Sequence, residues 1–80
     1  MREFKNETGE VWHAKAIDHM VAHGKPGAAM VFVPADDPDA EPLRSHVTFN
    51  STAAADLTLG TLGDKELRRR LKVAQAEAMG

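Results

Sequence analysis

The chain has 80 residues, of which 42% are hydrophobic and 28% are charged, as in an ordinary globular domain with one small core. It contains no cysteine, which excludes disulfide bonds, thiolate nucleophiles and cysteine-ligated zinc sites. The formal net charge of -2 gives the whole molecule no attraction toward polyanions, so any such attraction has to be local. A core of this size offsets the conformational entropy of folding only narrowly, which suggests support from a larger assembly.

Long apolar runs are absent from the sequence. Residues 1–5 lack the apolar stretch that a secretory signal requires, and no run approaches the roughly 20 residues of a membrane-spanning helix. We therefore expect a soluble, cytoplasmic protein that has no transmembrane segment of its own.

A hairpin is predicted at the N-terminus, with strands at about 2–6 and 11–21. Between them, Gly9 can adopt the positive φ that closes a tight turn. Residues 11–22 fit two periods, because alternate residues from Trp12 would form one face of a strand, whereas Trp12, Ala16 and His19 would line one side of a helix. The turn before them and their β-favouring side chains favour the strand.

The middle of the chain predicts a buried strand, an exposed loop and a half-buried strand. Residues 24–27 are rich in glycine and proline and mark a turn, and the continuous apolar run at about 28–34 is typical of a central strand. Residues 34–42 contain three prolines and four acidic residues, so we expect an exposed loop. Residues 43–50 alternate, which places one set on a single face of a strand: Leu43, Ser45, Val47 and Phe49.

The last predicted element is an amphipathic helix at about 64–78. Asp64 is expected to cap its N-terminus, and an apolar stripe recurs at helical spacing through Leu67, Leu71 and Ala74. Glu66 and Arg70 are four residues apart on this helix, so we expect an exposed ion pair between them.

Residues 51–62 give no clear period. Their alanines could open a turn of helix and their leucines could lie at the sheet edge, so we expect irregular cover over the core, with a flexible connector at 60–63. The whole pattern predicts one α+β domain over residues 1–80, in which a small antiparallel β-meander of three to four strands is packed on one face by the C-terminal amphipathic helix.

Residues 4–14 (FKNETGEVWHA) and 63–68 (GDKELR) resemble small bacterial proteins that are built as a short β-meander with a closing helix. Turn residues, one tryptophan and a helix start carry this resemblance. It implies the fold, and it implies no activity, cofactor or site residue.

Candidates for catalysis or metal binding are few. His19 and His23 would share one face if residues 11–22 formed a helix, and Asp18 or His46 could then complete a site for Zn²⁺ or Ni²⁺. On a strand the two imidazoles lie far apart, so we expect surface histidines. The acidic residues of the loop lie outside any cleft, and no serine has the sequence context of a nucleophile. We therefore expect no enzyme activity, no cofactor and no metal.

Four basic residues on the outward side of the final helix are the main functional lead: Lys65, Arg68, Arg69 and Lys72. Such a cluster is most often a solvated surface. Binding of nucleic acid is less favoured, because aromatic stacking partners are nearly absent from this region and the acidic loop opposes approach. Contact with an acidic protein surface or anionic headgroups needs only the charges and some apolar area.

Trp12 is either an interface anchor or a core residue, and the scarcity of aromatic residues favours the core. We predict a non-catalytic accessory subunit that docks on a larger protein assembly, with these interaction residues: Trp12, Lys65, Arg68, Arg69 and Lys72. One specific form of this prediction is a subunit at the cytoplasmic face of a membrane bioenergetic or photosynthetic complex. The alternative is a small nucleic-acid-binding regulator that uses the basic face of the helix.

Overall fold

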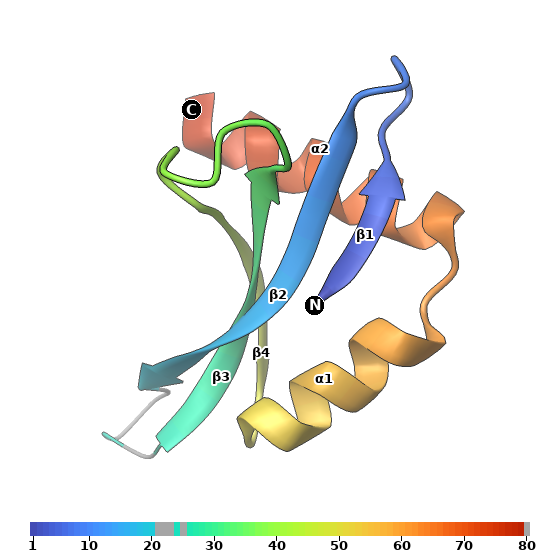
Figure 1. Ribbon diagram of the computed structural model, residues 1–80. Coiled ribbons are helices and arrows are strands. Elements are labelled where there is room, and N and C mark those ends of the chain that lie inside the picture. Colours follow the sequence, from blue (N-terminus) through green and yellow to red (C-terminus); the bar gives the residue numbers. More distant parts are fainter. Residues whose placement is uncertain (21–23, 25, 80) are drawn as a thin grey trace.

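The computed structural model describes residues 1–20, 24 and 26–79. In these residues a four-stranded antiparallel sheet is followed by two helices (Figure 1). The strands lie in the sheet in chain order: β1 (Arg2–Lys5), β2 (Val11–Met20), β3 (Pro26–Pro34) and β4 (Leu43–Phe49). Helices α1 (Thr52–Thr61) and α2 (Asp64–Met79) both contribute to the core on one face of this sheet. The predicted α+β meander is confirmed.

The turn between β1 and β2 depends on one asparagine and one glycine. The side-chain oxygen of Asn6 accepts hydrogen bonds from the backbone N–H groups of Thr8, at 3.0 Å, and Glu10, at 2.8 Å. Gly9 has a φ of +87°, a left-handed conformation that glycine adopts at little steric cost. The predicted turn is therefore confirmed, and the residues after it form a strand and not a helix.

β3 is an inner strand of the sheet, and it pairs with β2 on one side and β4 on the other. Every residue from Gly27 to Val33 is buried, as the continuous apolar run predicted. Because successive side chains of a strand point to opposite faces, Met30 and Phe32 face the helices while Val31 and Val33 face away from them. The strand begins two residues earlier than predicted.

The hydrophobic core lies between the sheet and the two helices. The rings of Phe4 and Phe32 meet edge to face with their centroids 5.9 Å apart, an arrangement that aromatic pairs favour. The apolar stripe predicted for α2 is confirmed, because its members are buried in this core. The buried residues of the core come from both helices and from β1 to β3: Phe4, Trp12, Ala14, Met30, Phe32, Leu59, Leu67, Leu71 and Ala74.

β4 keeps the predicted alternation across a bulge. Leu43 and Phe49 pack against the core, while Arg44 and Thr48 are exposed. The register with β3 shifts between Ala29 and Val31, which interrupts the ladder of hydrogen bonds between the two strands. The alternation therefore survives, although the pairing of the two strands is irregular.

The irregular cover predicted for residues 51–62 is wrong, because residues 52–61 form the helix α1. The side-chain oxygen of Ser51 accepts a hydrogen bond from the backbone N–H of Ala54 at 3.1 Å and caps the start of the helix. Only Ala55 and Leu59 of α1 are buried, so the sequence carries no broad apolar stripe to reveal the helix. The expected connector at 60–63 is correspondingly shorter, because Gly60 belongs to the last turn of α1.

With Asp64 as the cap, the first helical residue would be Lys65, but α2 begins one residue earlier, at Asp64 itself. The backbone carbonyl of Gly63 accepts a hydrogen bond from the N–H of Leu67 at 3.1 Å, so Gly63 takes the capping position and Asp64 is the first helical residue. The carboxylate of Asp64 instead accepts a hydrogen bond from Nη2 of Arg2 at 2.8 Å. This ion pair joins the start of α2 to the edge strand β1.

Candidate functional site

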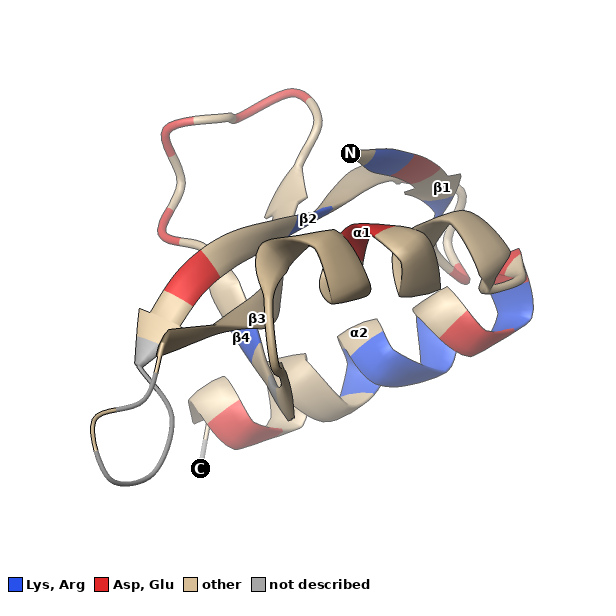
Figure 2. Ribbon diagram, turned by 90° about the horizontal axis from the view of Figure 1, so that it is seen from below, with Lys and Arg blue, Asp and Glu red and all other residues tan. Residues whose placement is uncertain are grey.

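The four basic residues predicted on the outer side of α2 lie around one surface groove. Its volume is about 570 Å³, and Gly63 also lines it. A second groove, of about 270 Å³, reaches the turn between β1 and β2 and shares Glu7, Arg68 and Lys72 with the first. Figure 2 shows the basic residues along α2. We use the name α2 surface for the charged residues of the larger groove: Glu7, Lys65, Glu66, Arg68, Arg69 and Lys72.

Arg68 connects α2 to the sheet. Its Nε donates a hydrogen bond to the backbone carbonyl of Lys5, the last residue of β1, at 2.9 Å. The Arg2–Asp64 ion pair joins the same two elements. Arg68 therefore has a structural role in addition to the charge that it brings to the α2 surface.

Glu66 binds two arginines. It accepts hydrogen bonds from Nε of Arg69 at 3.0 Å and from Nε of Arg70 at 3.2 Å. The predicted pair of Glu66 and Arg70 is therefore confirmed, although the side chain of Arg70 is half-buried, not exposed. The hydrogen bond from Arg69 holds the pKa of Glu66 below its ordinary value, against a partial loss of hydration, and the charges of both arginines add to the effect. The same hydrogen bond raises the pKa of Arg69.

Lys65 and Lys72 are the basic residues of the α2 surface that contact the fold least. Lys65 makes no ion pair or side-chain hydrogen bond within the described part of the chain. Nζ of Lys72 lies 4.0 Å from a carboxylate oxygen of Glu7, a long and exposed contact that contributes little to stability. The four basic residues and two carboxylates of the α2 surface together carry a formal charge of +2.

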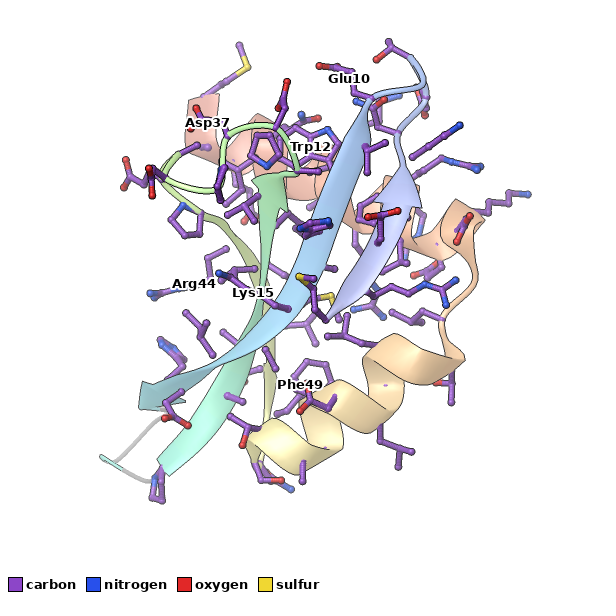
Figure 3. The ribbon with its side chains drawn as sticks, in the orientation of Figure 1. Glu10, Trp12, Lys15, Asp37, Arg44 and Phe49 are labelled. Atoms are coloured by element: carbon purple, nitrogen blue, oxygen red, sulfur yellow. The ribbon has the colours of Figure 1, made fainter. Side chains whose placement is uncertain are left out.

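Trp12 lies apart from the α2 surface. Its side chain belongs to the core, with 9% of the residue exposed, and it lies at the end of the sheet near the loop between β3 and β4 (Figure 3). The indole Nε1 is buried without a hydrogen-bond partner among the described residues. The structure therefore brings the four basic residues together and leaves the fifth predicted interaction residue inside the fold.

The histidines of the metal hypothesis do not share a helix. His19 is in strand β2, where it pairs with Gly27 of β3, and His23 lies outside the described residues. Among the residues that the structure describes, no three histidine or acidic side chains are placed to hold a metal ion. His13, on the same strand, has Nε2 at 3.2 Å from Oε2 of Glu3.

The face of the sheet that points away from both helices was not predicted from the sequence as a candidate site. Strand register places its residues in adjacent rows, and Lys15 and Arg44 are the Cα partners of Val31 from its two neighbouring strands. The alternation along β2 and β4 shows which residues share one face of the sheet. It does not show which of the two faces the helices cover. We use the name open face for the following residues: Glu3, His13, Lys15, Ile17, Ala29, Val31, Val33, Arg44 and Thr48.

Comparison of this chain with protein-family models, with curated proteins and with solved structures finds no match. Within the described residues, neither helix is long and apolar enough to cross a membrane.

Proposed function

We propose that the protein is a non-catalytic accessory subunit that docks on a larger protein assembly through the α2 surface. The observation that carries this proposal is the gathering of four basic side chains around one groove of about 570 Å³. Lys65 and Lys72 support it most directly, because the fold makes little use of their charges. A charge that contributes little to folding is available to a partner.

Arg68 and Arg69 are held in place before any partner arrives. Arg68 donates to a backbone carbonyl of β1, and Arg69 donates to Glu66 on the same helix. A side chain that is already ordered loses less conformational entropy when it binds, which raises affinity. The α2 surface therefore combines two positioned guanidinium groups with two exposed ammonium groups.

The mixed charge of the α2 surface favours a protein partner over nucleic acid. Glu7 and Glu66 lie among the basic residues, and Glu66, whose pKa is lowered by its hydrogen bond with Arg69, is ionised at neutral pH as an ordinary glutamate is. A phosphate backbone is negative along its whole length and would be repelled by these carboxylates, whereas a protein surface can place both signs of charge in register. The groove lining includes no aromatic side chain on which a base could stack.

Affinity capture of the full chain from the cells that express it, followed by mass spectrometry, tests the proposal. We expect a specific set of proteins at physiological salt, and its loss in the variant with Lys65→Glu and Lys72→Glu. The matched control is Lys15→Glu with Arg44→Glu, which makes the same change of charge on the open face and should keep the set. Recovery of the chain alone would contradict the proposal.

Two further outcomes of this capture have defined meanings. If the assembly is a membrane bioenergetic or photosynthetic complex with this subunit at its cytoplasmic face, capture from detergent-solubilised membranes should recover integral membrane proteins. If the retained material is nucleic acid, is lost on nuclease treatment and dissociates steeply with salt, the regulator alternative replaces the accessory subunit.

A further inference from the structure

The open face carries two basic side chains that have no internal partner. Lys15 and Arg44 are the Cα partners of Val31 on its two sides, so the register places all three side chains on one face of the sheet. Figure 3 labels Lys15 and Arg44. Neither basic residue makes an ion pair or a side-chain hydrogen bond within the described ranges. Val31 is only 1% exposed although the register places it on the face away from the described helices. The stems of long side chains such as those of lysine and arginine can cover apolar surface of this kind.

The loop between β3 and β4, residues 35–42, carries the opposite charge. Its four acidic residues are exposed and make no ion pair with the described residues: Asp36, Asp37, Asp39 and Glu41. Backbone hydrogen bonds give the loop a defined course, since Ala35 N–H donates to the carbonyl of Val11 at 3.0 Å and Ala40 N–H donates to that of Asp37 at 3.1 Å. Figure 2 shows most of the loop rising from the end of the sheet, away from α1, whereas Glu41 at the end of the loop lines a groove with Ala74 and Glu77 of α2. An acidic segment is thus held at the rim of the open face.

The edges of the sheet are poorly suited to assembly. β1 has four residues, three of which are charged, and β4 is interrupted by its bulge. Short, charged or bulged edge strands resist pairing with the edge of another sheet. Contact between two sheets of this kind is therefore favoured through the open face.

We infer that the open face binds the open face of a second copy of this chain, with the acidic loop of each molecule lying against Lys15 and Arg44 of the other. A two-fold contact buries the same patch on both molecules, so the patch must be complementary to itself. The open face has basic residues in its middle and acidic residues at its rim. These two groups meet in the dimer when the two-fold axis lies in the interface, runs across the strands, and passes between the basic and the acidic residues. The pairing of His13 with Val33, which lies next to that of Lys15 with Val31, would then be close to the axis.

The inferred dimer is independent of the proposed docking. The α2 surface lies on the helix side of the molecule, away from the open face, so both contacts can form together. Variants of one surface therefore serve as controls for the other. Failure of docking leaves the dimer untouched, and loss of the dimer leaves the captured protein set unchanged.

Sedimentation velocity of the full chain at low and high ionic strength tests the dimer. We expect a dimer at low salt that dissociates as salt rises, because exposed charges are screened over about 10 Å at 0.1 M ionic strength. A first variant, Lys15→Glu with Arg44→Glu, should be monomeric because the acidic loop then meets an acidic face. A second variant, with Asp36→Lys, Asp37→Lys and Asp39→Lys, should be monomeric because a basic loop meets a basic face.

An equimolar mixture of the two variants gives the decisive measurement. Each loop then faces a site of opposite charge, so the mixture should form a heterodimer although neither variant associates alone. Circular dichroism confirms that each variant is folded, and the control with Lys65→Glu and Lys72→Glu should still form the dimer. Wild-type protein that stays monomeric at low salt, or a mixture of folded variants that stays monomeric, would overturn the inference. Binding of polyglutamate to Lys15 and Arg44 of a monomeric wild type would assign the open face to an acidic partner instead.

Discussion

The two faces of the sheet are equally buried along β3, but they are buried by different means. Met30 and Phe32, each 0% exposed, point into the core that the two helices complete. Val31 and Val33, at 1% and 4%, point to the open face, where the described neighbours are side chains of adjacent strands. Exposed area alone does not separate the two sets of residues.

The two faces differ in how firmly the groups that cover them are held in place. The helix face is covered by a second layer whose ends are held by the Ser51 cap, by the Arg2–Asp64 ion pair and by the hydrogen bond from Arg68 to β1. On the open face, Val31 lies between Lys15 and Arg44, which make no ion pair or side-chain hydrogen bond with the described residues, so nothing in this part of the chain fixes their side chains. Residues of β3 that are equally buried on the two faces should therefore contribute unequally to the stability of the fold. Only on the open face can a partner replace the side chains that cover the strand.

The largest expected effect is a loss of stability on replacing Met30, compared with its sequence neighbour Val31. The two side chains lie on opposite faces of the sheet. Met30→Ala should lower the free energy of unfolding by about 2–5 kcal/mol, because the rigid core closes only partly over the cavity. Val31→Ala should cost only about 1.6 kcal/mol, which is the free energy of transferring two methylene groups at about 0.8 kcal/mol each with no added cost of a cavity. Urea denaturation at high salt, where the dimer is dissociated, measures both variants. An equal loss per carbon removed would show that the open face is as rigidly packed as the core.

A smaller effect tests how the helix layer is held. Ser51→Ala removes the cap of α1 and should cost about 1 kcal/mol, since the N–H of Ala54 then loses its side-chain acceptor. Ser51→Asp keeps an acceptor at this position and should recover most of the loss. Thermal unfolding followed by circular dichroism compares the variants with wild type. No loss in the alanine variant would mean that the packing of Ala55 and Leu59 holds α1 against the sheet without the cap.

Gly60 gives a smaller effect with the opposite sign. It lies within α1, and a methyl group added there meets no atom within 4 Å, so Gly60→Ala should stabilise the protein by about 0.5 kcal/mol through its higher helix propensity. Gly63→Ala is the control, because alanine is a poor residue for the capping position that Gly63 occupies before α2. The same melting experiment should show a gain for the first variant and none for the second.

The fold was predictable from the sequence where local pattern and tertiary contact agree. The alternation of residues 43–50 and the stripe through Leu67 and Leu71 each bury the face that they predict. Helix α1 could not be predicted in this way. Its only local signal is the capping residue Ser51, and it buries only Ala55 and Leu59, which are too few to give a helical period in the sequence. Asp64 was misplaced as a cap for a similar reason. Its partner Arg2 is 62 residues away, and nothing in the neighbouring sequence reveals it.

The candidate site was predictable only within α2. Helical spacing places Lys65, Arg68, Arg69 and Lys72 together, and the groove contains all four of them. The contribution of Glu7 and the hydrogen bond from Arg68 to β1 depend on long-range packing that no local pattern contains. The open face required the pairing register of three strands, because alternation along one strand does not show which of its faces the helices cover.

The smallest effect concerns the polar rim of the helix layer, where Glu66 binds Arg69 and Arg70. Its pKa lies below the ordinary value of 4.5, so the folded state favours the ionised carboxylate. The resulting stabilisation is present above pH 4.5 and is lost as the pH falls through the lowered pKa. Glu66→Gln removes it, so urea midpoints of wild type and variant should differ at neutral pH and converge in acid.

The comparison of wild type with Glu66→Gln also measures how much the ion pairs on the outside of α2 add to the stability that the apolar core provides. Both Glu66 and Arg69 are partly exposed, and solvent and salt weaken such pairs, so the difference between the two midpoints should be small and should shrink further at high salt. In an Arg69→Gln background the same replacement should lose most of its pH dependence, because Arg69 is the main cause of the lowered pKa. A difference as large as that of Met30→Ala would instead mean that these ion pairs within α2 contribute as much to stability as a buried side chain of the apolar core.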